Sequence, residues 1–136
     1  MAQRRNSSIG FFGRFGRSED LRSLDKALSA FDLHPARVPD AVKLAALTLL
    51  KDARGENPAP TDYAEAAVLL SFCALGRDGF IVANGEAAAA GVENRIDAAL
   101  ERGEGFDAGL ILLAVEAKII HPALKAEYQL ESEQGA

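Results

Sequence analysis

The chain has 136 residues, of which 49% are hydrophobic and 26% charged, and its formal net charge at pH 7 is −5. This length suits one domain that buries roughly two thirds of the surface its unfolded form would expose. Residues 1–17 carry four Arg and no acid, which leaves residues 18–136 with 11 basic and 20 acidic side chains, a net charge of −9. A body of that sign repels phosphate backbones, which argues against nucleic-acid binding through the folded part.

The sequence carries no pattern that predicts secretion or membrane insertion. No apolar run reaches the ~18 residues of a membrane span, and residues 1–30 lack the apolar core of a secretory signal. The single cysteine, Cys73, cannot form an internal disulfide, and its setting LLSFCALG suggests a small core residue. We therefore expect a soluble cytoplasmic protein.

Residues 1–17, MAQRRNSSIGFFGRFGR, show no helical period and predict a mobile basic arm. Its aromatic and cationic side chains alternate, a pattern suited to contact with an anionic membrane surface or a nucleic-acid strand. Two alternatives stay open: the Phe side chains fold back onto the helical domain, or the segment is an organelle transit peptide. The candidate contact residues are Phe11, Phe12, Phe15, Arg14 and Arg17.

A first helix is predicted to begin at Ser18, whose hydroxyl can cap free N–H groups, with two acids following at the positive end of the helix dipole. Its apolar side chains recur at three and four residues and end before His34-Pro35. They are Leu21, Leu24, Ala27, Leu28 and Phe31.

A second helix is predicted over residues 39–53. Two of its leucines fall in the same arc of the helical wheel as its charged side chains, where water is expected. Single exposed leucines are ordinary, but together with the lysines beside them they also suit contact with another chain, including a second copy of this one. The predicted interaction residues are Leu44, Leu47, Lys43 and Lys51.

The middle of the chain predicts two further helices. A loop at residues 54–60, RGENPAP, precedes a helix over residues 63–75 that is rich in small side chains, so another helix can approach it closely. Residues 76–79, GRDG, predict a tight turn with glycines at positive φ. Residues 80–83, FIVA, fit either an extended segment or a helical turn. A helix over residues 86–102 follows.

Residues 106–120, FDAGLILLAVEAKII, predict a helix that is apolar on almost every side and lies at the centre of a helical bundle, paired with the 63–75 helix. Glu116 and Lys118 lie about 160° apart on the wheel, so both cannot comfortably reach water through one gap. We expect Lys118 to be exposed, because its longer stem can snorkel, and Glu116 to be partly buried. A further helix after Pro122 is left open.

Candidate catalytic chemistry is limited to His34, His121 and Glu116. Both histidines precede proline where a helix ends, so a protonated ring is expected to interact with the terminal carbonyl groups. The alternative is an acid/base site formed by these histidines with a nearby carboxylate. The sequence contains no recognisable metal-ligand motif, and no cofactor is predicted.

These observations predict an all-α, single-domain helical bundle of five main helices over residues 18–132, with the arm at residues 1–17 and a polar tail at residues 133–136. The expected function is non-catalytic: binding of another protein, or self-association as a homodimer. The alternative is a small-molecule-binding protein or enzyme that uses a cleft near His34, His121 and the 76–85 loop. A polar cleft at those positions favours the alternative, whereas an exposed apolar patch favours protein binding.

Overall fold

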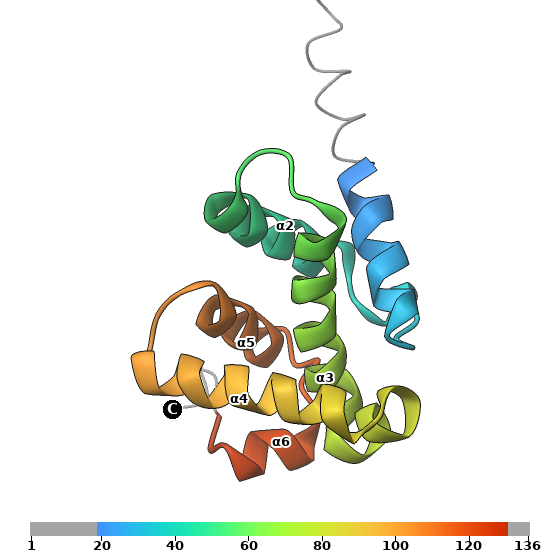
Figure 1. Cartoon of the computed structure of the whole chain (residues 1–136). Helices are drawn as coiled ribbons and strands as arrows, with labels where there is room; N and C mark the ends of the chain where they lie inside the picture. Colours follow the sequence, from blue (N-terminus) through green and yellow to red (C-terminus); the bar gives the residue numbers. More distant parts are fainter. Residues whose placement is uncertain (1–18, 131–136) are drawn as a thin grey trace, which may run out of the picture.

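The computed structural model describes residues 19–130, and every regular element within that range is a helix (Figure 1). The predicted all-α class is therefore confirmed. The basic arm, the Ser18 cap and the polar tail lie outside the described residues. In chain order the elements are an N-terminal helix at residues 19–30, the short 3-10 helix η1 (Pro35–Arg37), α2 (Asp40–Arg54), α3 (Pro60–Asn84), α4 (Glu86–Arg102), α5 (Phe106–Glu116) and α6 (Pro122–Glu127).

The helix at the centre of the fold is α3, which contacts α2, α4, α5 and α6 (Figure 1). The prediction that the 106–120 helix is surrounded on all faces is wrong, since Leu112 of α5 is 51% exposed. The expected packing of α3 against α5 is present, but α3 packs equally against α4. Because α3 is longer than α5, it contacts more of the other helices and lies at the centre of the core.

Gly76 bends α3 and allows it to continue beyond the predicted end at Leu75. Its backbone, at φ 80° and ψ 167°, lies in a region that is essentially reserved for glycine. The predicted positive φ is confirmed at Gly76 and is wrong at Gly79. The predicted turn over residues 76–79 is a kink, after which the helix resumes to Asn84. The resumed helix buries Phe80, whose ring meets that of Phe72 edge to face with centroids 5.2 Å apart.

The helix α5 ends at Glu116, four residues before its predicted end. The chain leaves the helix through Lys118, whose φ is 61°, and Ile119 donates its N–H to the carbonyl oxygen of Ala114 at 3.0 Å. This is the arrangement of a left-handed residue that closes a helix C-terminus. The chain then turns into α6, so a helix after Pro122 is present.

One hydrophobic core joins the N-terminal helix and the helices α2 to α6. Its largest fully buried side chains come from the N-terminal helix, α2, α3, α5 and α6 and from the segment between the first two. Cys73 lies in this core, and burial raises the pKa of its thiol to about 12. The thiol is therefore held in its neutral form, and the prediction of a buried core cysteine is confirmed.

Candidate functional site

The leucine face predicted on α2 is not an exposed patch. Leu47 is buried at 4% exposure, and Leu44 is half-buried against the same core. The N-terminal helix explains this burial, because two of its carboxylates reach across to the lysines of that face. The expectation that both leucines point into water is wrong, since the sequence does not show which helix covers which arc.

The two lysines of that face form ion pairs within the chain. Lys43, only 5% exposed, places Nζ 2.9 Å from Oδ1 of Asp25 and 3.7 Å from Oδ1 of Asp40. Lys51 places Nζ 2.6 Å from Oδ2 of Asp20. Both lysines therefore hold the N-terminal helix on α2 and do not form a free cationic surface.

Each histidine caps the helix that follows it, not the one that precedes it. Nδ1 of His34 accepts the N–H of Ala36, and Nδ1 of His121 accepts the N–H of Ala123, both at 3.0 Å. An accepting Nδ1 carries no proton, so the hydrogen-bond pattern assigns the ring proton to Nε2. The prediction of protonated rings at helix carboxyl ends is wrong. Neither ring forms a hydrogen bond with a carboxylate in residues 19–130.

Glu116 and Lys118 are both exposed. The prediction of a partly buried Glu116 assumed one continuous helix to residue 120. Because α5 ends at Glu116, the two residues do not share a helical wheel, and each side chain reaches water separately. Exposure of Glu116 removes the buried carboxylate that was the main support for an acid/base site.

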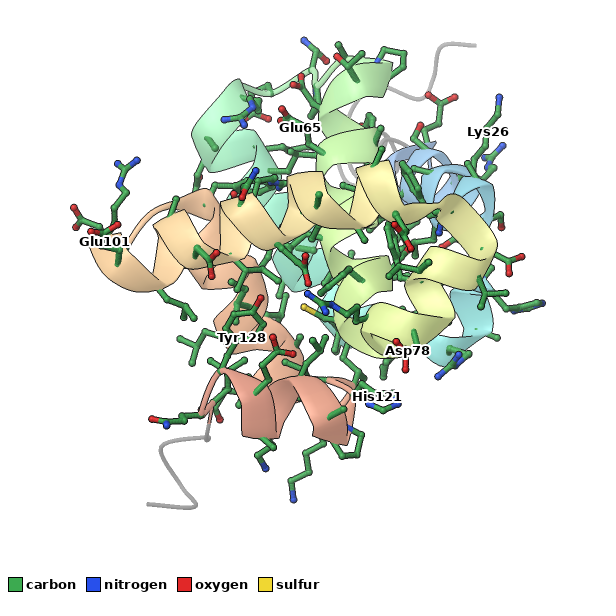
Figure 2. The ribbon with its side chains drawn as sticks, turned by 60° about the horizontal axis from the view of Figure 1, so that its bottom comes forward. Lys26, Glu65, Asp78, Glu101, His121 and Tyr128 are labelled. Atoms are coloured by element: carbon green, nitrogen blue, oxygen red, sulfur yellow. The ribbon has the colours of Figure 1, made fainter. Side chains whose placement is uncertain are left out.

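A basic cleft of about 350 Å³ lies where η1, α3 and the turn before α6 meet. Figure 2 shows His121 at the start of α6, next to the part of α3 that carries Asp78. Basic side chains line this cleft together with apolar ones, and no carboxylate of residues 19–130 lines it. The lining residues are Arg37, Ala74, Lys118, Ile119, Ile120, His121 and Pro122.

The basic cleft contains only part of the predicted site. His121 lines it, whereas His34 and residues 76–85 do not. Sequence reasoning missed Arg37 and Lys118. The available signal was the tripeptide His-Pro-Ala, which occurs at residues 34–36 and again at 121–123, with a basic residue close to each copy.

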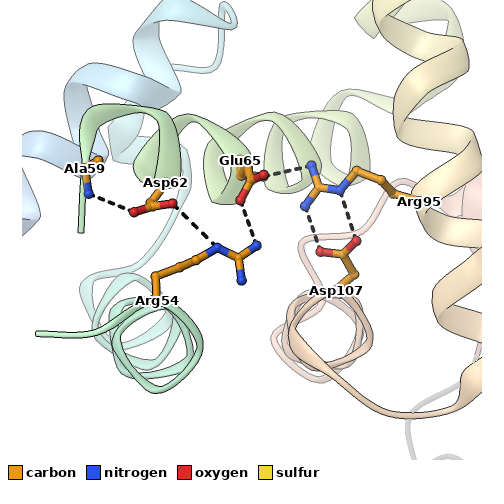
Figure 3. A network of polar contacts seen from close by, with 6 residues as sticks. All are labelled: Arg54, Ala59, Asp62, Glu65, Arg95 and Asp107. Carbon is orange, nitrogen blue, oxygen red and sulfur yellow. Dashed lines mark hydrogen bonds and ion pairs between the residues drawn. The ribbon is translucent and has the colours of Figure 1, made fainter. Parts of the chain in front are cut away.

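A second group of polar side chains joins four helices (Figure 3). Arg95 of α4 forms a bidentate pair with Asp107 of α5, at 3.0 and 2.7 Å, and donates to the carbonyl oxygen of Glu65 at 3.0 Å. Arg54 of α2 donates to Oε1 of Glu65 at 2.8 Å and lies over the Phe106 ring, 5.3 Å from its centroid. Every charge of this network is paired, which indicates a structural role.

A groove of about 570 Å³ lies between the N-terminal helix and the start of α3. Most of its lining residues are small or apolar, and three are charged. Tyr63 lies in it and donates its hydroxyl to Oδ1 of Asp20 at 2.8 Å. The residues that line the groove are Glu19, Asp20, Ser23, Lys26, Ala27, Ala30, Phe31, Asn57, Pro58, Pro60, Tyr63 and Ala64.

Comparison with known proteins adds no assignment: the sequence matches no protein-family model, and neither a curated protein nor a solved structure is significantly similar to it. Residues 19–130 contain no group of three or more His, Cys, Asp or Glu that could hold a metal ion. The candidate contact residues of the arm, from Phe11 to Arg17, lie outside the described residues.

Among the described helices, α3 alone is long and apolar enough to cross a membrane by length and composition. The most apolar 18-residue window of α3 is 56% buried within the protein. The kink at Gly76 and the four helices packed around α3 are features of a core helix.

Proposed function

We propose that this chain is a non-catalytic, single-domain helical bundle that binds another protein, and that the groove between the N-terminal helix and α3 is the binding surface. The observation that supports the proposal is the groove itself, about 570 Å³ in volume and lined mainly by small and apolar side chains. Grooves of this kind accept an apolar segment of a partner, either helical or extended. The buried thiol of Cys73 suits the reducing cytoplasm.

Small side chains on both walls make the groove accessible to a partner backbone. Ala27 and Ala30 come from the N-terminal helix and Ala64 from α3. Alanine walls let a second backbone approach closely, while the half-buried Phe31 offers a large apolar contact at one end. The side chains of the partner would therefore supply most of the apolar volume in the complex.

The partner segment is expected to carry aromatic or aliphatic side chains next to Arg or Lys, and no carboxylate. Residues 18–136 have a net charge of −9, and a field of that sign accelerates the approach of cationic segments and disfavours acidic ones. Glu19, which lines the groove, is exposed and available to a cation. The apolar side chains would supply affinity, and the charges would supply orientation.

Residues 8–17 of this chain, SIGFFGRFGR, fit that description by sequence and make a suitable first probe. We would add this peptide to the ¹⁵N-labelled full chain and follow amide shifts by NMR. Shifts are expected to cluster at groove residues such as Ser23, Ala27 and Ala64. A peptide with Arg14→Glu and Arg17→Glu should bind more weakly.

Matched variants assign the binding to the groove. Ala30→Lys places a long cation on the groove wall and should abolish the shifts. Ala90→Lys changes an alanine of α4 that is also exposed but lies outside the groove, and it should preserve the shifts. Sedimentation velocity of the full chain then measures self-association. Peptide shifts that are absent, or that survive Ala30→Lys, would refute the groove proposal.

A further inference from the structure

The two His-Pro-Ala turns bring basic side chains together from distant parts of the chain. The first turn leads into Arg37 at the end of η1, and the second follows Lys118 and begins with His121. These three residues line the basic cleft of about 350 Å³. Two cationic residues separated by 81 positions in the sequence, Arg37 and Lys118, therefore meet at one place in an acidic protein.

The cations of the basic cleft are not neutralised by the described chain. Arg37 and Lys118 are exposed, and neither forms a salt bridge with a carboxylate in residues 19–130. This distinguishes them from Lys43, Lys51, Arg54 and Arg95, which are all paired. These two cations, unpaired within residues 19–130, are thus available to a ligand.

His121 adds a neutral hydrogen-bond donor to the two cations. Its Nδ1 is occupied by the N–H of Ala123, which leaves the proton on Nε2. The ring is held against Gly76, and its own backbone N–H donates to the carbonyl oxygen of Cys73 at 2.7 Å. Helix α3 therefore fixes the position of this ring before any ligand arrives.

We propose that the basic cleft binds a phosphate monoester, with its phosphoryl group between Arg37, Lys118 and His121. A phosphoryl group presents three acceptor oxygens and close to two negative charges, which matches donors that approach from three separate residues. A carboxylate has two oxygens and is satisfied by one bidentate arginine. The number and separation of the donors therefore favour the phosphoryl group.

The apolar lining favours an ester over inorganic phosphate. Ile119, Ile120, Pro122 and Ala74 line the same cleft, whose volume of about 350 Å³ exceeds that of a phosphate ion. This volume lies at the lower end of the ~300–1,000 Å³ typical of small-molecule sites. A small aromatic or aliphatic alcohol would fill the remainder and bury apolar surface.

The acidic body weakens this binding without preventing it. The net charge of residues 18–136 repels a dianion at long range, but at 0.15 M salt the Debye length is about 8 Å. Within that distance the side chains that line the cleft determine the potential. The cleft is also separate from the proposed protein-binding groove, since Ala74 and Tyr63 of α3 lie 11 residues apart, about 16 Å along a helix.

Calorimetric titration of the full chain with phenyl phosphate at 0.15 M NaCl tests the proposal, with inorganic phosphate and benzoate as comparison ligands. We expect saturable binding of phenyl phosphate that is tighter than either comparison ligand. Arg37→Gln and Lys118→Asn should each weaken it at least about tenfold, because each removes one charged hydrogen bond. Asparagine is chosen at residue 118 because it tolerates positive φ.

Arg22→Gln is the matched control, because Arg22 is an exposed arginine of the N-terminal helix outside the cleft. The Arg22→Gln variant should bind phenyl phosphate with the affinity of the wild type. Circular dichroism confirms that each variant is folded. Absence of saturable binding, or binding that survives both cleft substitutions, would overturn the proposal. Equal affinity for benzoate would show that the cleft does not select a phosphoryl group. Equal affinity for inorganic phosphate would show that the cleft does not select an ester.

Discussion

The imidazole ring of His121 lies directly on the backbone of Gly76: a methyl group at Gly76 would come within 2.8 Å of Cδ2 and Cγ of the ring. The carbonyl group of Cys73, three residues before the kink at Gly76, accepts the N–H of His121 at 2.7 Å. One glycine therefore bends α3 and anchors the turn that carries the basic cleft.

Gly76→Ala is predicted to destabilise the fold by about 2–4 kcal/mol. Part of this loss arises because alanine must adopt a φ of 80°, which costs a residue with a Cβ on the order of 1–3 kcal/mol. The rest arises because the new methyl group must displace the His121 ring. Urea unfolding measures the change. In the double variant with His121→Ala the contact cost should disappear and the φ cost should remain.

Gly91→Ala is the control for that experiment. Gly91 lies within α4, and a Cβ at this position would meet no atom within 4 Å. Alanine should therefore stabilise the protein by about 0.5–1 kcal/mol through helix propensity. A Gly76→Ala variant as stable as the wild type would contradict the packing of His121 described here.

The second prediction concerns the contact between the N-terminal helix and α2. Lys43→Ala should lower the free energy of unfolding by about 2–3 kcal/mol, because it removes a buried stem and leaves Asp25 without its ion-pair partner. Denaturant unfolding of Lys43→Ala, Asp25→Ala and the double variant gives the coupling, expected at about 1–2 kcal/mol. Lys26 is an exposed lysine of the N-terminal helix, and Lys26→Ala should change the free energy of unfolding by less than about 0.5 kcal/mol.

Local sequence signals predicted the helices better than they predicted their neighbours. The bounds of α4 at Glu86 and Arg102 agree with the structure, because glycines flank both ends. The wheel analysis of α2 correctly placed Leu47 beside Lys43, yet it could not show that Asp20 and Asp25 approach from another helix. A charged residue on a wheel indicates water or an ion-pair partner, and only the tertiary fold distinguishes them.

The candidate cleft was partly predictable for the same reason. Proline after each histidine correctly indicated a helix boundary. Each boundary lies between two helices, however, and each histidine ring caps the helix that follows it. The left-handed conformation at Lys118 ended α5 early and exposed Glu116, although the apolar pattern continues to Ile120. A lysine carries no sequence signal for positive φ, so this change of direction was not predictable.

The third prediction concerns alkaline pH. Burial, followed by the hydrogen bond to Asp20, raises the pKa of Tyr63 to about 12. The folded state therefore holds this proton more tightly than the unfolded state, in which tyrosine titrates near 10. The contribution of protonated Tyr63 to the free energy of unfolding is fully present below about pH 10 and is lost as the pH rises through 12.

Tyr63→Phe should therefore lower stability by about 1 kcal/mol at pH 8, the value of a typical hydrogen bond. The difference from the wild type should shrink as the pH rises above 10 and reverse as ionised Tyr63 becomes costly in the fold. Urea unfolding from pH 8 to 11.5 measures both curves. Burial also raises the pKa of Tyr128 and of Cys73 to about 12. Both groups are present in the wild type and in Tyr63→Phe, so they contribute the same pH dependence of stability to both curves. Parallel curves would contradict the assignment to Tyr63.

The last prediction concerns Ser71, which is fully buried in α3 and whose Oγ has no hydrogen-bond partner among the described residues. A buried hydroxyl without a partner costs about 1–3 kcal/mol of desolvation. Ser71→Ala removes this cost with little change in volume and should raise the free energy of unfolding by about 1–2 kcal/mol. Thermal unfolding should shift upward by about 3–6 °C.

Helix propensity alone favours alanine over serine by about 0.5 kcal/mol, so this part of the gain must be separated. Ser29→Ala supplies the comparison, because Ser29 is an exposed serine of the N-terminal helix and its replacement changes propensity without changing a buried group. The excess of Ser71→Ala over Ser29→Ala then measures the buried hydroxyl. Equal gains would show that Ser71 finds a partner in solution, such as the carbonyl group one turn earlier in α3, and the desolvation argument would fail.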